Sequence, residues 1–156
     1  MPTLMPAQQT QDHAFVTGSI RPVVLCIFQH KGKILVKKIS RGTSASPVYM
    51  PPGGGLIFGE YSWESIRIEI KKELGEEIKN LSFLGTSEQV TAEGQIPRHE
   101  IIFLFKGELA NEAAYQEEIF WGVDEAGQPV QATWKPISFF KKNKGTLYPD
   151  LILELV

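Results

Sequence analysis

Residues 51–75 constrain the fold of this 156-residue chain more than any other segment. They begin with the run Pro51-Pro52-Gly53-Gly54-Gly55, which we expect to continue neither a helix nor a regular strand. The residues that follow predict a helix over 62–74, with Ser62 as its N-cap and Gly75 where a glycine commonly ends a helix. The pattern therefore indicates a glycine-rich loop that leads into one well-defined helix.

This predicted helix has two distinct faces. At about 100° per residue, an apolar arc that we expect to face the core is formed by Trp63, Ile66, Ile70 and Leu74. Glu69 and Glu73 lie roughly a quarter turn away, four residues apart, so their carboxylates stack and repel each other. A divalent cation such as Mg²⁺ would remove that repulsion, whereas two ordinary solvated glutamates would need no ligand.

The spacing of the whole segment resembles the signature of the Nudix hydrolases. That signature is a glycine, five residues, a glutamate, seven residues, then Arg-Glu-apolar-x-Glu-Glu-x-Gly-apolar. Gly54 and Glu60 match its first two positions, and the run Ile68-Glu69-Ile70-Lys71-Lys72-Glu73-Leu74-Gly75-Glu76 follows at the required distance. The loop glycines of the resemblance are Gly53, Gly54, Gly55, Gly59 and Gly75. We expect Gly54 to tolerate a β-carbon least, with milder effects at its neighbours, because it either takes a positive φ or packs closely against the helix.

The resemblance implies an α/β (α+β) fold, a Nudix-like α/β/α sandwich with a mixed β-sheet between helices. It also implies Mg²⁺- or Mn²⁺-dependent cleavage of the pyrophosphate bond in a nucleoside diphosphate linked to another moiety. By the match of positions, Glu69 and Glu73 are the implied catalytic and metal-binding residues, and Glu60 is a further implied metal position. A bound metal would shield the pyrophosphate charge and lower the pKa of an attacking water.

Three positions depart from the signature. Ile68 replaces the arginine, Lys72 replaces the first glutamate of the Glu-Glu pair, and Glu76 replaces the last apolar residue. The change at Lys72 removes a ligand and adds a cation. Lys72 could extend away into solvent or contact phosphate itself, and a substitute ligand or substrate contact could come from Glu76, Glu77, Glu100 or Arg98. The alternative function is accordingly a catalytically weakened or inactive nucleotide-binding module with the same fold.

The rest of the chain predicts one domain. Residues 1–18 form a polar N-terminal arm, and residues 19–156 form the single Nudix-like domain. Strands are expected over residues 20–28 and 33–39, as a hairpin with a buried first strand, and over 78–88, 99–109 and 130–135. Residues 41–47 read as a loop, 111–118 as a short helix or loop, and 147–156 as a closing helix.

Composition limits the partners. The formal net charge of −2 argues against broad binding to nucleic acid, and we expect no specific nucleic-acid partner. No membrane segment or signal peptide is predicted, and the single cysteine, Cys26, predicts a buried thiol and a cytoplasmic protein. The predicted partner is a small nucleotide or nucleotide-sugar diphosphate, and the resemblance makes a homodimer plausible.

Overall fold

The computed structural model describes residues 18–43, 46–91 and 97–156. The predicted N-terminal arm, except Gly18, lies outside these residues. The strands form two mixed sheets. The first has the order β5-β1-β7-β6, with bounds Gly53–Gly55, Ile20–Ile27, Arg98–Leu109 and Ile78–Thr91. The second has the order β10-β4-β3-β9-β8, with bounds Thr146–Leu147, Ser46–Met50, Lys33–Thr43, Pro129–Pro136 and Ile119–Val123, and β2 (Gln29–His30) pairs with β3.

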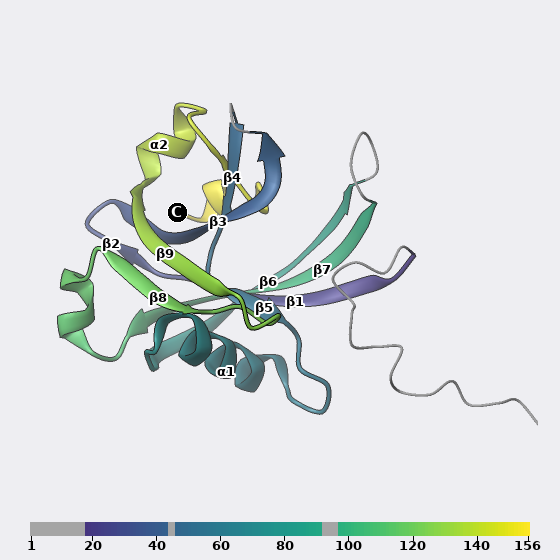
Figure 1. Ribbon diagram of the computed structural model, residues 1–156, viewed down its shortest axis with the longest axis horizontal. Helices are drawn as coiled ribbons and strands as arrows, with labels where there is room; N and C mark the ends of the chain where they lie inside the picture. The colour runs from purple at the N-terminus through teal and green to yellow at the C-terminus, as the bar shows by residue number, and fades with distance from the viewer. Residues whose placement is uncertain (1–17, 44–45, 92–96) are drawn as a thin grey trace, which may run out of the picture.

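Helices cover both sides of the sheets, as the sequence predicts. Figure 1 shows α1 (Ser62–Leu74) on one side, and α2 (Ile137–Lys141) and the chain end with α3 (Ile152–Leu155) on the other. A 3₁₀ helix, η3, spans Glu112–Gln116. The α+β class with mixed sheets is therefore confirmed. None of the helices in the described part of the chain is long and apolar enough to cross a membrane.

Strand β1 lies between two hydrophobic clusters. Val24 and Cys26 pack with Ile66 and Ile70 of α1, whereas Val23, Leu25 and Ile27 belong to the cluster that contains Phe140, Leu147 and Ile152. Both faces of β1 are therefore buried, which explains its continuous apolar sequence and confirms the prediction for this strand and for Cys26. Burial raises the pKa of the Cys26 thiol.

The predicted hairpin between residues 20–28 and 33–39 is wrong. Strand β1 pairs with β5 and β7 in the first sheet, and only the two residues of β2 form the hairpin with β3 in the second. The chain passes between the sheets at Phe28, whose carbonyl still accepts a hydrogen bond from the Leu35 N–H at 3.0 Å. Both edges of β1 are already paired, so β3 joins the other sheet.

Helix α1 has the predicted bounds, and Gly75 ends it in the left-handed conformation at φ 72°. Its N-cap is Tyr61 rather than Ser62: the Tyr61 N–H donates to the Glu64 carboxylate at 3.1 Å. Ile66, Ile70 and Leu74 are buried as expected, but Trp63 is 52% exposed. Trp63 instead lines an open groove with Phe83, Phe103 and Phe105 of the first sheet.

The glycine run also departs from its prediction. Gly53–Gly55 is a short strand, β5, that pairs antiparallel with β1, with Leu25 opposite Gly53 and Val23 opposite Gly55. The Cys26 N–H donates to the Pro52 carbonyl at 3.0 Å and extends this contact. Local preference disfavours a strand at three consecutive glycines. Pairing with the free edge of β1 nevertheless holds Gly53–Gly55 in a strand conformation.

The remaining differences lie at element ends and in short elements that were not predicted. The predicted loop 41–47 is largely strand, because β3 continues to Thr43 and β4 starts at Ser46. The closing helix over residues 147–156 is reduced to α3, which follows a cis Tyr148–Pro149 bond. Strand β8 was not predicted, although Phe120 is buried between exposed Ile119 and Trp121, a period-two pattern. Gly122 of β8 packs closely against α1, because a Cβ added to this glycine would lie 2.2 Å from the Glu73 carbonyl oxygen.

Candidate functional site

The first half of the candidate site joins Glu73, Gly53 and Lys37. The Gly53 N–H donates to Glu73 Oε1 at 2.6 Å, and the Gly53 carbonyl accepts from Lys37 Nζ at 2.8 Å. Lys37 Nζ also donates to Glu73 Oε2 in a short buried ion pair. Burial raises the pKa of Glu73, and the opposing effects of Lys37 and the Gly53 N–H do not cancel it. Strands β3 and β5 are therefore both bonded to the Glu73 carboxylate of helix α1.

The second half is Glu69, one turn earlier on α1. Its side chain is only 3% exposed, and among the described residues Oε2 has no hydrogen-bond partner. This oxygen faces Gly54, where an added Cβ would lie 2.7 Å away. The other oxygen, Oε1, contacts the half-exposed Lys72 Nζ at 3.4 Å. A buried carboxylate oxygen without a donor is costly, and a cation would satisfy it.

These residues fit one divalent cation at Glu69 better than a centre of several carboxylates. Mg²⁺ is commonly held by one or two carboxylates, with waters and substrate phosphate oxygens completing its shell. In the described part of the chain, no three His, Cys, Asp or Glu side chains lie together as metal ligands. Glu60 is exposed, and a hydrogen bond with Glu64 raises its pKa. Glu60 and Glu76 are thus not brought into one group with Glu69 and Glu73.

Glu100 forms a separate buried cluster. It accepts two hydrogen bonds from Arg41, at 2.7 and 3.0 Å, one from Arg21 at 3.2 Å and one from the Tyr148 hydroxyl at 2.6 Å. Burial raises the pKa of Glu100, but the bonds from Arg41 and Tyr148 outweigh it and hold the pKa below its usual value. With both oxygens occupied, Glu100 is a poor substitute metal ligand.

The predicted substrate contact Arg98 begins β7 beside this cluster. Burial lowers its pKa, and the nearby charge of Arg41 lowers it further. The charge of Glu100 acts in the opposite direction and raises it, so the Arg98 guanidinium lies within electrostatic range of the cluster.

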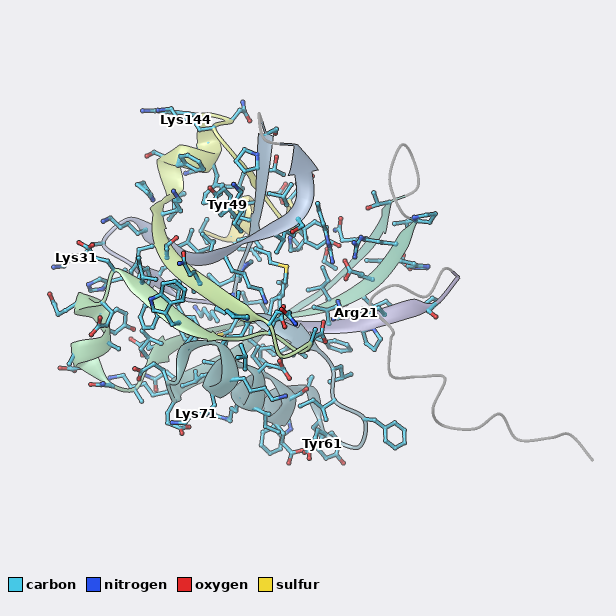
Figure 2. The ribbon with its side chains drawn as sticks, viewed as in Figure 1. Arg21, Lys31, Tyr49, Tyr61, Lys71 and Lys144 are labelled. Carbon is cyan, nitrogen blue, oxygen red and sulfur yellow. The ribbon has the colours of Figure 1, made fainter. Side chains whose placement is uncertain are left out.

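Sequence reasoning missed Lys37 and Glu125. Glu125, in the turn between β8 and β9, accepts a hydrogen bond from the Gly55 N–H at 3.0 Å and pairs with Arg21, which Figure 2 labels on β1. Nothing local in that turn links it to Gly55. Lys37 did leave a signal, because the two-residue period of β3 places it on the same face as the buried Leu35.

The Glu100 cluster predicts a pH-dependent contribution to stability. We expect Glu100→Gln to lower the free energy of unfolding by about 3 kcal/mol at pH 7, because Arg21 and Arg41 lose a buried counter-ion. A depressed folded-state pKa contributes stability above the unfolded pKa of about 4.3, and that contribution is lost as pH falls through the folded pKa. Urea denaturation at pH 7 and near pH 3 should therefore show a difference from the parent that shrinks in acid. The exposed Glu88→Gln is the control, and an equal loss at both pH values would contradict the argument.

No protein-family model and no curated protein sequence matches the chain. Among solved structures, a Nudix hydrolase from Nitrosomonas europaea is 19% identical, with a TM-score of 0.60 over 87% of this chain and 85% of that one.

A MutT protein from Bacillus halodurans is 22% identical, with a TM-score of 0.57 over 86% of this chain and 80% of that one. A MutT Nudix hydrolase from Burkholderia pseudomallei is 16% identical, with a TM-score of 0.55 over 77% and 85%. These similarities, together with the α+β architecture and the two mixed sheets, show that the chain has the Nudix fold.

Proposed function

We propose that the protein is a metal-dependent hydrolase that cleaves the pyrophosphate bond of a nucleoside diphosphate linked to another moiety. The observation that carries the proposal is the buried Glu69 Oε2, which has no partner among the described residues and faces the glycine strand at Gly54. An oxygen of this kind, in a chain with the Nudix fold, is best explained by a ligand that arrives with the substrate.

Glu69 would hold Mg²⁺ or Mn²⁺. When bound, the metal would shield the pyrophosphate charge and lower the pKa of a water. Lys72 Nζ, half exposed, lies 3.4 Å from Glu69 Oε1 and competes with the metal for that carboxylate. Lys37 compensates the buried charge of Glu73, so the site does not present two uncompensated anions to an anionic substrate. Arg98 offers a further cationic group for a small nucleotide or nucleotide-sugar diphosphate.

A second candidate function has a specific observation in its favour. Both site carboxylates already have an ammonium partner, Lys72 on Glu69 and Lys37 on Glu73. This balance would weaken metal binding and leave a nucleotide-binding module with little turnover. Location in the cytoplasm and a homodimeric state complete the proposal and rest on Cys26 and on the family resemblance.

A metal-dependent substrate screen tests both functions. The parent protein is incubated with nucleoside triphosphates, ADP-ribose, nucleotide sugars, dinucleoside polyphosphates and NADH, with Mg²⁺, with Mn²⁺ and with EDTA. Hydrolysis that EDTA abolishes supports the enzyme. Saturable nucleotide binding without hydrolysis supports the binding module. Neither binding nor hydrolysis of any compound would refute both.

The departure at Lys72 has its own expected result. Lys72→Glu should tighten Mn²⁺ binding and raise hydrolysis about tenfold, which corresponds to roughly 1.4 kcal/mol of barrier. The reason is that the change removes a cation 3.4 Å from Glu69 and adds a carboxylate at the same helix position. Calorimetry with Mn²⁺ and steady-state kinetics measure the two effects.

The control is Lys71→Glu, at an exposed lysine that pairs with Glu77 on the outer side of α1 (Figure 2). It should change neither quantity. A fall in turnover or nucleotide affinity for Lys72→Glu would instead identify Lys72 as a phosphate contact.

A further inference from the structure

Lys37 is a buried lysine in the middle of the second sheet. It lies on β3 between Met50 of β4 and Ala132 of β9, and its side chain is 9% exposed. A lysine is rarely buried unless its ammonium is paired. Its neighbour Lys38 is exposed. The burial of Lys37 therefore depends on partners for its ammonium inside the protein, at Gly53 and Glu73.

The ammonium of Lys37 meets two oxygens that a divalent cation would also select. One is the Gly53 carbonyl at 2.8 Å and the other is Glu73 Oε2. A backbone carbonyl and a carboxylate are both hard oxygen ligands of the kind that Mg²⁺ and Ca²⁺ take. Glu73 Oε1 is bound to the Gly53 N–H, so the carboxylate is fixed in position. The oxygens are arranged around a positive charge, and that charge belongs to the protein.

The two buried carboxylates of α1, Glu69 and Glu73, differ in the cations that they contact. Burial raises the pKa of Glu73 most, and the negative charge of Glu69 raises it further. Lys37 compensates Glu73 from inside the protein, whereas Glu69 keeps a buried oxygen without a partner among the described residues. Glu73 thus has a buried ammonium as its partner, whereas Glu69 has only the half-exposed Lys72 at Oε1 and no partner among the described residues at Oε2.

We propose that Lys37 occupies the position of a divalent cation between the Gly53 carbonyl and Glu73, so that metal reaches Glu73 only when this ammonium is removed. The inference deepens the proposed function, because it concerns the same loop–helix site. It changes one expectation from the sequence, namely that Glu73 binds metal directly. In the parent protein Mn²⁺ binds through Glu69, and Glu73 contributes little.

The test is to remove the ammonium and measure metal binding without substrate. Lys37→Met keeps an unbranched apolar side chain and leaves the Gly53 carbonyl and Glu73 free. Calorimetry should show Mn²⁺ binding at least about tenfold tighter than in the parent, because a unit positive charge in contact with the carboxylate is lost. The melting temperature of Lys37→Met should be below that of the parent in EDTA, and Mn²⁺ should raise it more than in the parent. Lys38→Met, at the exposed neighbour, should behave like the parent.

A folded Lys37→Met protein with unchanged Mn²⁺ affinity would overturn the inference. The double variant Lys37→Met/Glu73→Gln covers the case in which the single variant does not fold, because it removes both buried charges together. It should fold and should show no gain in Mn²⁺ affinity. If the double variant folds while Lys37→Met stays unfolded even in millimolar Mn²⁺, a divalent ion cannot replace the ammonium and the inference is wrong. An equal gain in both variants would also refute it, because Glu73 would then not be the ligand.

These outcomes are independent of the proposed hydrolase activity. Metal affinity and melting are measured without nucleotide, so an unmasked Mn²⁺ site in Lys37→Met stands even if no substrate is cleaved. Conversely, a failure of the Lys37 test leaves the result of the hydrolysis screen on the parent protein unaffected.

Discussion

Gly53→Ala is expected to lower the free energy of unfolding by at least about 4 kcal/mol. This is a large part of the total stability of an ordinary domain. A Cβ at this position would lie 2.0 Å from the Val24 carbonyl oxygen and 2.9 Å from Leu25 Cα. Both are backbone atoms of β1, which is buried on both faces and paired on both edges. The φ of Gly53 is +149°, a conformation that L residues rarely adopt. Neither the strand nor the substituted residue can adjust without breaking the β1–β5 pairing.

Urea denaturation of three alanine variants separates the causes. Gly59 has a φ of +87° but no atom within 4 Å of an added Cβ, so Gly59→Ala measures backbone strain alone, about 1 kcal/mol. Gly54 has no positive φ, and its Cβ would meet the Glu69 carboxylate rather than backbone. Gly54→Ala should therefore affect metal binding more than stability. Equal stability of Gly53→Ala and Gly59→Ala would mean that the contact with Val24 is not tight.

This ranking corrects an expectation from the sequence. The Nudix-like spacing singles out Gly54 as the least replaceable glycine, with milder effects at its neighbours. The predicted close packing of Gly54 against α1 is present, as the 2.7 Å approach to Glu69 shows. The stronger restriction nevertheless falls on Gly53, because its neighbour is backbone and not the end of a side chain.

Glu69→Gln is expected to lower turnover by at least about a hundredfold on the best substrate of the screen, the scale of losing a positioned acid–base or ligand group. It should also remove most of the Mn²⁺ affinity of the parent, because a neutral amide is a much poorer ligand than a carboxylate. Both expectations rest on the buried Oε2 of Glu69, which has no partner among the residues that the structure describes.

Stability separates this effect from misfolding. Glutamine has the shape of glutamate and removes a poorly compensated buried charge, so the melting temperature of Glu69→Gln should equal or exceed that of the parent. The control is Glu77→Gln, at a carboxylate that is 67% exposed and pairs with the exposed Lys71. A Glu69→Gln protein that retains turnover and Mn²⁺ affinity would exclude Glu69 from the function.

Local patterns determined a large part of this fold. The bounds of α1 follow from the apolar period of Ile66, Ile70 and Leu74 and from Gly75, all within one helix. The buried β1 follows from its unbroken apolar run. The stacking of Glu69 and Glu73 on one face of α1 follows from helical geometry alone, and both are buried. In each case the residues that decide the outcome lie within a few positions of each other.

Other features were decided by the tertiary structure alone, because they depend on residues that are far apart in the chain. Gly53–Gly55 becomes a strand because β1, about 30 residues earlier, offers an edge to pair with. Trp63 has the spacing of a core residue, yet it is half exposed and lines an open groove with Phe83 and Phe103 of the first sheet.

The ion pairs of the site could not be predicted from the sequence for the same reason. The period of β3 places Lys37 on a buried face, but its partner Glu73 is 36 positions away and the sequence does not identify it. Glu100 looks like a spare metal ligand until Arg21, Arg41 and Tyr148 converge on it from 79, 59 and 48 positions away. A buried charge is tolerable only with its partner in place, and partners at such separations meet only in the folded chain.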